Sequence, residues 1–509
     1  MDKKISKLIY YLLPTFGHLL WIVTFFLVLS RGQQMLNADG DLFLHLNLGK
    51  FISNTGKIPL RDVFSHTMTG QPVIQHEWLS SVILALVKNL FGLKGIILLF
   101  ALVVATAFWV LYKHLYQKSQ TIMLSLFVVV FVIMTSFVHW IARPHMFTFF
   151  FLALWMLLLD RLSQRKYNLW WAMPAMMLVW VNMHGGFIIG FITWIIYGFG
   201  AGWDTLLNKN KKDQAFDSLF WRYYFQSGLI SFLVSLINPS GIGLWRKIIS
   251  HVGNQYLADF TQEFNSPNFH LTGTWPFLIY IALLVVVLGK QKKKADTGLL
   301  FNSAAWLVMG LYSGRNIPLF AIVAAPLLAC GLADLVEQFA DRFEFIKKFQ
   351  TLENRIQTTD KTLKGFLWPV FIVFVTILGL SVGYRFDSES LGYTIDPNVF
   401  PVEAVDWLEE NPQEGEMFNF FTWGGYLEYR LWPGKRVFID SKSDFYGEDF
   451  VRQYVQVINT QEGWEDIIEQ YSVDWAILPL NELAAEAMQL ELGWETQYKD
   501  DTAVILRLN

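Results

Sequence analysis

The sequence contains a single cysteine, Cys330, among 509 residues. One cysteine cannot form an intrachain disulfide, which excludes a disulfide framework, and it also excludes a cysteine-based metal site. Charged residues are scarce as well, because Asp, Glu, Lys and Arg make up 16% of the chain whereas 53% of it is hydrophobic. Soluble globular chains can approach that apolar fraction, but they seldom gather it in long uncharged runs.

Four long stretches contain no charged residue at all: Ile9–Ser30, Thr121–Val138, Thr272–Gly289 and Gly365–Tyr384. A helix needs about 20 residues to cross roughly 30 Å of hydrocarbon, and each stretch is close to that length. We therefore predict a polytopic α-helical membrane protein with about eleven transmembrane helices. The apolar segments fall near 8–30, 95–112, 121–138, 146–160, 168–183, 187–202, 224–237, 272–289, 298–312, 317–335 and 365–384.

Two segments need a separate interpretation. The N-terminus superficially resembles a signal peptide, but its apolar run is too long and no small-residue cleavage site follows, so we predict an uncleaved first helix. Trp78–Phe91 is apolar but short, and Lys88 and Lys94 lie near its end. We interpret it as an interfacial or re-entrant helix, with an extra pair of short spans as the alternative.

Charge divides the chain into two parts. Residues 1–384 contain 32 Lys and Arg against 18 Asp and Glu, whereas residues 385–509 contain 8 against 25. This break follows the last apolar run, so we predict a membrane module over 1–384, with a large first outer loop over 31–94, and a small water-soluble domain over 385–509. The acidity of that domain disfavours nucleic acid as a partner.

The positive-inside rule sets the orientation. If the N-terminus is cytoplasmic, the cytoplasmic segments hold 22 basic residues and the opposite loops hold 10. We therefore predict a multi-pass membrane protein with its N-terminus in the cytoplasm and its C-terminal domain on the non-cytoplasmic side.

This orientation places the unusual polar residues on one side of the membrane. A single Arg at a helix end usually reaches for headgroups, and a lone loop Asp is usually a cap or a solvated carboxylate. Acids, arginines and histidines from five separate outer loops are harder to explain in that way, because ionisable groups at membrane depth tend to mark functional sites. The candidates are Asp39, Asp41, His45, His76, Glu77, Arg143, His145, His184, Glu263 and Arg315.

The pair Asp39 and Asp41 permits two kinds of chemistry. Two carboxylates spaced in this way could chelate a divalent cation through their oxygen atoms. One of them could equally act as a general base toward an acceptor hydroxyl. Arg143 and Arg315 suit recognition of a phosphate. An acid at the membrane surface together with arginines describes an enzyme that uses a lipid phosphate as its leaving group.

The whole chain resembles the GT-C superfamily of membrane glycosyltransferases, which includes protein O-mannosyltransferases, aminoarabinose transferases and the catalytic subunits of oligosaccharyltransferases. The chain looks most similar to a bacterial branch of that superfamily, which implies a place in the bacterial inner (plasma) membrane. The resemblance rests on these stretches: Asp39-Gly-Asp-Leu-Phe-Leu-His45, Gly56-Lys-Ile-Pro-Leu-Arg-Asp-Val-Phe-Ser65, Gln75-His-Glu-Trp-Leu-Ser80, Ala142-Arg-Pro-His145, Trp180-Val-Asn-Met-His-Gly-Gly186, Asn238-Pro-Ser-Gly241 and Ser313-Gly-Arg-Asn-Ile-Pro318.

The resemblance implies a GT-C-like helical fold, a polyprenyl-phosphate-linked sugar donor and a catalytic carboxylate in the first outer loop. By position, Asp39 is the first choice for that carboxylate and Asp41 the second. Arg143 and Arg315 become candidates for the lipid phosphate, and Glu263 for the acceptor or a metal. Some branches use Mn or Mg and others need no metal, so the cofactor stays open. Asp39 is followed by Gly-Asp and not by Glu, which argues against a protein mannosyltransferase.

Residues 397–509 alternate between helical and strand-like patterns, which predicts a small α/β domain. We expect a helix over Pro401–Glu410, a second helix through Phe450, Tyr454 and Ile458, and strands over Met417–Phe421, Arg436–Asp440, Trp475–Leu478 and Ala503–Leu508. In Thr422-Trp-Gly-Gly-Tyr-Leu427, two glycines indicate a close backbone approach or a positive φ. The arrangement is loosely similar to the Trp-rich motif with which oligosaccharyltransferases bind the acceptor peptide, although the Trp-Trp-Asp residues are absent. This resemblance makes Trp423 and Tyr426 candidates for binding the acceptor, and packing within the domain is the alternative.

The favoured function is a glycosyltransferase that moves a sugar from a polyprenyl-phosphate carrier to a lipid, glycan or protein on the non-cytoplasmic face. The alternative is a non-enzymatic lipid or glycan transporter, or an assembly subunit whose outer domain binds a partner. Transporters often show internal repeats and broken helices at the middle of the membrane. The sequence shows no such repeat, and its polar groups gather at one surface, which favours the enzyme.

Overall fold

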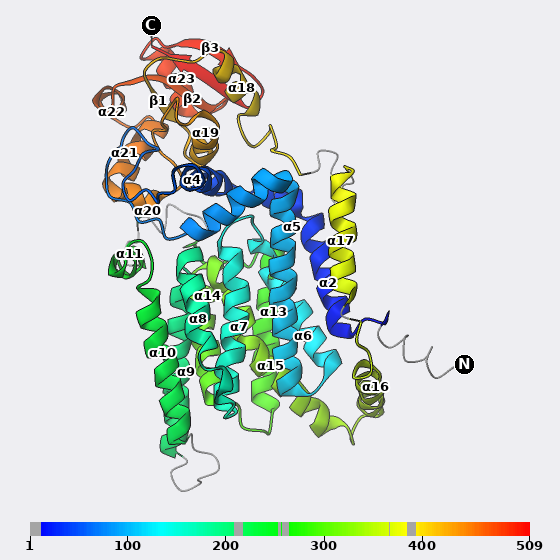
Figure 1. The fold of residues 1–509 in the computed structure, drawn as a ribbon. Coiled ribbons are helices and arrows are strands. Elements are labelled where there is room, and N and C mark those ends of the chain that lie inside the picture. Colours follow the sequence, from blue (N-terminus) through cyan, green and yellow to red (C-terminus); the bar gives the residue numbers. More distant parts are fainter. Residues whose placement is uncertain are drawn as a thin grey trace.

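The computed structural model describes residues 12–207, 217–252, 256, 264–365, 367–383 and 393–508. Its larger part is a bundle of helices that run roughly side by side, and the C-terminal domain covers one end of this bundle (Figure 1). The bundle helices are α2 (Phe16–Ser30), α5 (Trp78–Ser119), α6 (Ile122–Ser136), α7 (His145–Ser163), α8 (Ala172–Met183), α9 (Phe187–Leu207), α10 (Ser218–Ser235), α13 (Trp275–Lys290), α14 (Thr297–Tyr312), α15 (Ile317–Phe339) and α17 (Leu367–Ser381).

Helical bundles of this composition suit a membrane, because every backbone group is paired within its own helix. Among the described residues, six helices are long and apolar enough to cross a membrane, namely α5, α6, α7, α9, α13 and α15, counted with their flanking 3-10 turns. The helices α2, α14 and α17 are apolar but shorter. Within the described residues, each of the eleven predicted segments overlaps a helix of the bundle, but the predicted count of eleven spans is not confirmed.

Helix α5 contains a sharp break at Gly92. This residue adopts φ 68° and ψ −166°, a region that is open to glycine and closed to residues with a side chain. The first part of α5 lies across the end of the bundle, and the second part runs down through it (Figure 1). The short apolar segment Trp78–Phe91 thus has a direction of its own, as expected for a helix that lies along a surface.

Three helices lie outside the main bundle. Helix α4 (Asp41–Thr55) lies between the bundle and the C-terminal domain, and α11 (Ile242–Val252) lies beside that domain (Figure 1). Helix α16 (Glu344–Asp360) lies at the opposite end of the bundle, near the start of α2 (Figure 1). The remaining short elements are α3 (Gly32–Leu36), η1 (Phe137–His139), η2 (Tyr167–Leu169), η4 (Thr272–Thr274) and η5 (Gly314–Asn316).

The C-terminal domain is built on a four-stranded sheet of described strands in the order β1-β2-β4-β3. Strands β1 and β2 are parallel, and the other two pairs are antiparallel. The α/β prediction is therefore correct for this domain. Its elements are α18 (Val402–Glu410), β1 (Glu416–Asn419), η6 (Phe421–Trp423), α19 (Gly424–Leu431), α20 (Ser443–Tyr446), α21 (Glu448–Ile458), α22 (Trp464–Gln470), β2 (Val473–Pro479), α23 (Leu483–Leu490), β3 (Glu495–Lys499) and β4 (Ala503–Arg507).

The predicted strand Arg436–Asp440 is wrong. Only Val437 makes an isolated bridge, to Ser65 of the first outer loop. The backbone N–H groups of Phe438 and Ile439 donate instead to the side-chain oxygen of Asn419, at 2.8 and 3.3 Å. The backbone polar groups of this apolar segment form hydrogen bonds with the first outer loop and with the Asn419 side chain. They therefore do not pair with a strand of the sheet.

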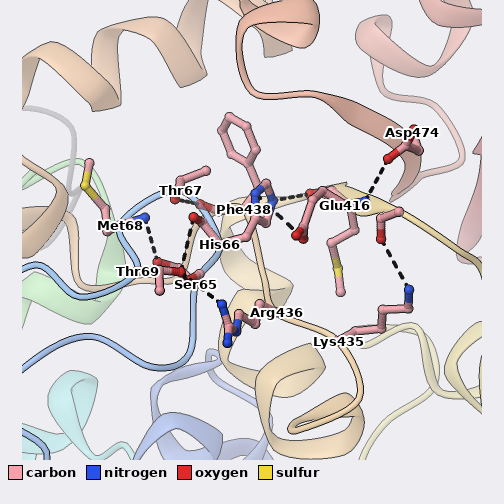
Figure 2. A network of polar contacts seen from close by, with 12 residues as sticks. Ser65, His66, Thr67, Met68, Thr69, Glu416, Lys435, Arg436, Phe438 and Asp474 are labelled. Atoms are coloured by element: carbon pink, nitrogen blue, oxygen red, sulfur yellow. Dashed lines mark hydrogen bonds and ion pairs between the residues drawn. The ribbon is translucent and has the colours of Figure 1, made fainter.

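The first outer loop docks on the C-terminal domain through backbone and side-chain hydrogen bonds (Figure 2). The His66 ring lies 2.9 Å from the Met417 carbonyl oxygen, and the Thr67 hydroxyl donates to the Phe438 carbonyl at 2.6 Å. Arg436 donates to the Thr69 hydroxyl at 3.3 Å. These contacts fix the domain over the loop that carries the candidate carboxylates.

Two glycines bring the backbones of α4 and α19 into direct contact. A Cβ atom on Gly40 would lie 2.4 Å from the Thr422 carbonyl oxygen, and one on Gly425 would lie 2.4 Å from the Gly40 carbonyl oxygen. The paired glycines of the Thr422–Leu427 motif therefore serve a close approach of backbones, which was one of the two predicted reasons for them. Phe43 on α4 adds edge-to-face contacts with Tyr426 and Phe400, each at 5.1 Å between ring centroids.

Candidate active site

The two candidate carboxylates lie at the N-terminus of α4. Asp39 precedes the helix, and its Oδ1 accepts a hydrogen bond from the backbone N–H of Asp41 at 2.9 Å. Asp41 occupies the first turn, where the unpaired N–H groups and the helix dipole favour a negative charge. The start of helix α4 therefore fixes the positions of the two carboxylates relative to each other.

Arg143 joins the two acids. It lies in the turn before α7, and its Nε and Nη2 atoms lie 2.7 and 2.6 Å from Asp39 Oδ2. Its Nη1 atom lies 3.1 Å from Asp41 Oδ2. The structure thus brings together three predicted site residues from two outer loops, and one guanidinium contacts both carboxylates.

Asp39 remains a usable base in this setting. Burial raises the pKa of Asp39 to about 6, the charge of Asp41 adds to the rise, and the Arg143 charge and its hydrogen bonds oppose it. A carboxyl group with this pKa is largely ionised at neutral pH but binds a proton more readily than an ordinary aspartate. That is the range in which a general base works best.

A second cluster surrounds Glu77, the residue immediately before α5. Its Oε1 lies 3.4 Å from His184 Nε2 and 3.8 Å from His76 Nε2, and its Oε2 lies 3.5 Å from His45 Nε2. His45 follows Asp41 by one helical turn on α4, so both residues lie on the same face of that helix. The four predicted residues of this cluster therefore adjoin the carboxylate pair.

Burial sets the charge state of this cluster. It raises the pKa of Glu77 to about 8, and the Asp41 charge contributes, whereas the Lys247 charge opposes the rise. Burial also lowers the pKa of His45 to about 4 and that of His76 to about 3. At neutral pH the cluster therefore offers uncharged groups that both donate and accept hydrogen bonds.

The structure places the other predicted residues around this centre. The His145 ring lies 6.4 Å from the His184 ring, and His145 Nε2 lies 2.9 Å from the His139 carbonyl oxygen. Arg315 lies over the Phe264 ring at 4.6 Å, and its charge contributes to the low pKa of His184, which is caused mainly by burial. Glu263 lies outside the described residues.

Trp423 and Tyr426 are buried between the C-terminal domain and α4. Trp423 donates its indole N–H to the Val399 carbonyl at 2.9 Å, and Tyr426 accepts a hydrogen bond from Arg430 at 2.7 Å. Both side chains belong to the hydrophobic core, at 4% and 0% exposed. Their burial agrees with the packing alternative, and a role in binding the acceptor stays a prediction.

Three residues at the site had no predicted role. Ser441 donates its hydroxyl to Asp41 Oδ1, so the C-terminal domain contributes directly to the carboxylate pair. Lys247 of α11 forms an ion pair with Asp444 at 2.8 Å. Ser441 and Asp444 belong to a segment whose sequence indicated only a strand and its end. Lys247 follows the Asn238–Gly241 motif by six residues, but it is not part of that motif and drew no prediction.

The described side chains do not fit a divalent cation. Asp39 Oδ2 and Asp41 Oδ2 both point at the Arg143 guanidinium, which occupies the position that a shared cation would take. Within the described ranges, no group of three or more His, Cys, Asp or Glu side chains is arranged to hold a metal ion. We therefore assign no role in the reaction to the divalent cation that the resemblance allows.

No family model matches this sequence, and no curated protein sequence is similar enough to count as a match. Solved structures do match. The archaeal oligosaccharyltransferase AglB from Archaeoglobus fulgidus, in complex with an inhibitory peptide and a dolichol-phosphate, has a TM-score of 0.58 at 11% identity, over 93% of this chain and 70% of that one.

Two further structures agree with this likeness. The Archaeoglobus fulgidus oligosaccharyltransferase tethered to an acceptor peptide has a TM-score of 0.57 at 12% identity, over 93% of this chain and 69% of that one. ArnT from Cupriavidus metallidurans in the apo state has a TM-score of 0.50 at 12% identity, over 97% of both chains. The resemblance drawn from the motifs is thus confirmed at the level of the fold, which this chain shares with AglB and ArnT.

Proposed function

We propose that the protein is a glycosyltransferase that moves a sugar from a polyprenyl-phosphate-linked donor to an acceptor on the non-cytoplasmic face of the membrane. The observation that carries this proposal is the group of Asp39, Asp41 and Arg143 at the end of the bundle under the C-terminal domain. The shared fold supports the class of enzyme, because its neighbours include an oligosaccharyltransferase in complex with dolichol-phosphate.

In the proposed reaction, Asp39 takes the proton from an acceptor hydroxyl or amide. The acceptor atom then bonds to the anomeric carbon of the sugar, while the bond from that carbon to the phosphate oxygen breaks. The bonding pair leaves with the phosphate, so the products are the glycosylated acceptor and polyprenyl phosphate. The neutral Glu77 cluster suits the hydroxyl groups of the sugar or the acceptor, and positioning supplies much of the remaining catalysis. Cations beside the leaving phosphate, with Arg143 and Arg315 as candidates, stabilise its charge.

We place the protein in the bacterial inner membrane with its C-terminal domain outside. This orientation is supported by the way basic and acidic residues gather at opposite ends of the molecule. The basic segment around α16 lies at one end and the acidic domain at the other (Figure 1), which is the arrangement that the positive-inside rule favours for cytoplasmic and outer ends respectively.

The direct test is to incubate the purified protein with labelled polyprenyl-phosphate sugars and a membrane extract that supplies acceptors. We expect at least one donor to yield a labelled product and free polyprenyl phosphate in equal amounts. Intact donor throughout the panel, with a folded protein, would contradict an enzymatic role and favour a transporter or an assembly subunit.

The activity should fall at low pH as Asp39 becomes protonated. Because a base must be ionised to accept a proton, kcat/KM should decline as the pH drops through about 6, the value for Asp39 in the free protein. Arg143 holds this pKa down, so Arg143→Gln should move the decline to higher pH, and Arg143→Lys should move it less because the charge is kept. A pH profile that is identical in all three proteins would contradict the assignment of Asp39 as the base.

Removal of divalent cations should leave transfer intact. Because Arg143 already contacts both carboxylates, we expect EDTA to change the rate by less than about twofold, a change of under about 0.5 kcal/mol in the barrier. The measurement is the initial transfer rate after dialysis against EDTA, with and without added Mg or Mn. Loss of activity that either metal restores would show that the carboxylates leave Arg143 to bind a cation.

A further inference from the structure

Helix α11 has two different faces at the end of the bundle that bears the C-terminal domain. Ile242 and Ile249 are separated by seven residues, share one face with the exposed Arg246 and are 47% and 65% exposed. Lys247 lies on the other side of the helix, where its side chain is only 20% exposed. The helix follows α10, and Leu229 of α10 and Ile237, which lies just after it, are each 60% exposed. An amphipathic helix of this kind lies at the membrane surface with its apolar face in lipid.

Lys247 faces the candidate active site. Its ammonium group lies 2.8 Å from Asp444 of the C-terminal domain. Burial lowers the pKa of His76, and the Lys247 charge lowers it further. The same charge opposes the rise in the pKa of Glu77 that burial causes. Lys247 therefore interacts electrostatically with both His76 and Glu77. One helix thus exposes apolar side chains on one side and pairs Lys247 with the C-terminal domain on the other.

The cations at the site differ in how firmly they are engaged. Three nitrogen atoms of Arg143 contact the two carboxylates, and to withdraw them would leave Asp39 and Asp41 side by side without a counter-charge. The Lys247 ion pair, by contrast, is a point-charge contact to a carboxylate that is itself 23% exposed to solvent. A lysine can exchange such a partner for a phosphate oxygen at small cost, because its three donors rotate freely.

We propose that Lys247 binds the phosphate of the lipid-linked donor by exchanging the carboxylate of Asp444 for a phosphate oxygen. The inference rests on the proposed function and adds to it the residue that receives the donor. A carrier anchored in the bilayer meets α11 first, since the apolar face of this helix is in lipid and Lys247 is on the adjoining inner face. Binding at Lys247 leaves Arg143 with the two acids, so Asp39 stays ionised while the donor is in place.

The test measures donor binding and transfer separately in Lys247→Gln, Lys247→Arg and Asp444→Asn. Arg246→Gln is the matched control, because Arg246 is the preceding residue on α11, carries the same charge and is exposed. The probe for binding is polyprenyl phosphate without a sugar, titrated against each protein in nanodiscs. Thermal unfolding of each variant shows whether the fold is retained.

We expect Lys247→Gln to weaken binding of polyprenyl phosphate at least tenfold and to raise KM for the donor similarly, with little change in kcat. Lys247→Arg and Arg246→Gln should stay within about threefold of the wild type, a difference below about 0.7 kcal/mol. Asp444→Asn should bind the phosphate as well as the wild type or better, because it removes the competing carboxylate.

Two outcomes would overturn the inference. If Lys247→Gln and Asp444→Asn weaken binding equally, the ion pair only holds α11 against the C-terminal domain and does not bind the phosphate. If Lys247→Gln binds polyprenyl phosphate like the wild type, the phosphate is held elsewhere. Failure of the proposed function looks different, since the wild-type protein itself would then neither bind polyprenyl phosphate nor cleave a donor.

Discussion

Asp39→Asn is expected to reduce the rate of sugar transfer by about 10²–10⁴-fold, the range that a positioned general base contributes. Asparagine has nearly the shape of aspartate and still accepts the backbone hydrogen bond from Asp41, so the start of α4 should be preserved. What it loses is the negative charge that takes the proton and pairs with Arg143. The measurement is kcat/KM for the donor in reconstituted protein, with unfolding temperature as the check on the fold.

Asp41→Asn is the companion to this experiment. Asp41 contacts the same arginine at 3.1 Å and accepts a hydrogen bond from Ser441, so the variant removes one charge at almost the same place. We expect a smaller loss, because Asp41 supports the pair and Asp39 takes the proton. A larger loss in Asp41→Asn than in Asp39→Asn would reverse the two roles, and full activity in both variants would remove the proposed base.

Gly425→Ala is the second change with a large expected effect. The new Cβ atom would lie 2.4 Å from the Gly40 carbonyl oxygen and 2.9 Å from Leu44 Cγ, so α19 and α4 must move apart. Overpacking of this kind costs about 1–3 kcal/mol of stability. The same movement shifts the C-terminal domain, which holds Asp41 through Ser441, and a displacement of about 1 Å at a catalytic group can cost about 10²-fold in rate.

The effect of Gly425→Ala cannot come from helix propensity, because alanine is the better helix former by about 1 kcal/mol. Gly289→Ala is the control, since a Cβ atom at Gly289 on α13 would meet no atom within 4 Å. We expect the control to be as stable and as active as the wild type. Equal unfolding temperatures and rates for Gly425→Ala and Gly289→Ala would contradict the account of the α4–α19 contact.

Much of the fold follows from the sequence because its signals are local. Uncharged runs such as Thr272–Gly289 coincide with helices, and the helical spacing of Phe450 and Tyr454 coincides with α21. Strand Glu495–Lys499 was missed because it is an exposed edge strand without alternating apolar residues. The apolar pattern of Arg436–Asp440 predicts a strand. It does not reveal that the hydrogen-bond partners of this segment are a loop and the side chain of Asn419. Local patterns do not report such long-range partners.

The site was predictable to the extent that topology brings residues to one end of the bundle. Orientation placed Asp39, Asp41 and Arg143 on a common side, and the structure joins them. The pairing itself is a contact between residues 104 positions apart, which no spacing rule supplies. The parts played by Ser441 and Lys247 depend on how the C-terminal domain docks, and that docking rests on backbone contacts at Gly40 and Gly425.

We propose that the end of the bundle under the C-terminal domain cleaves a lipid-linked sugar donor, with Asp39 as the base. It is tested most directly in proteoliposomes that carry a labelled polyprenyl-phosphate sugar and an acceptor extract, by following both the cleavage of the donor and its movement between leaflets. The account predicts that the wild-type protein releases polyprenyl phosphate in step with product, and that Asp39→Asn binds the donor but releases almost none. Movement of intact donor across the bilayer without cleavage, equal in the two proteins, would contradict it.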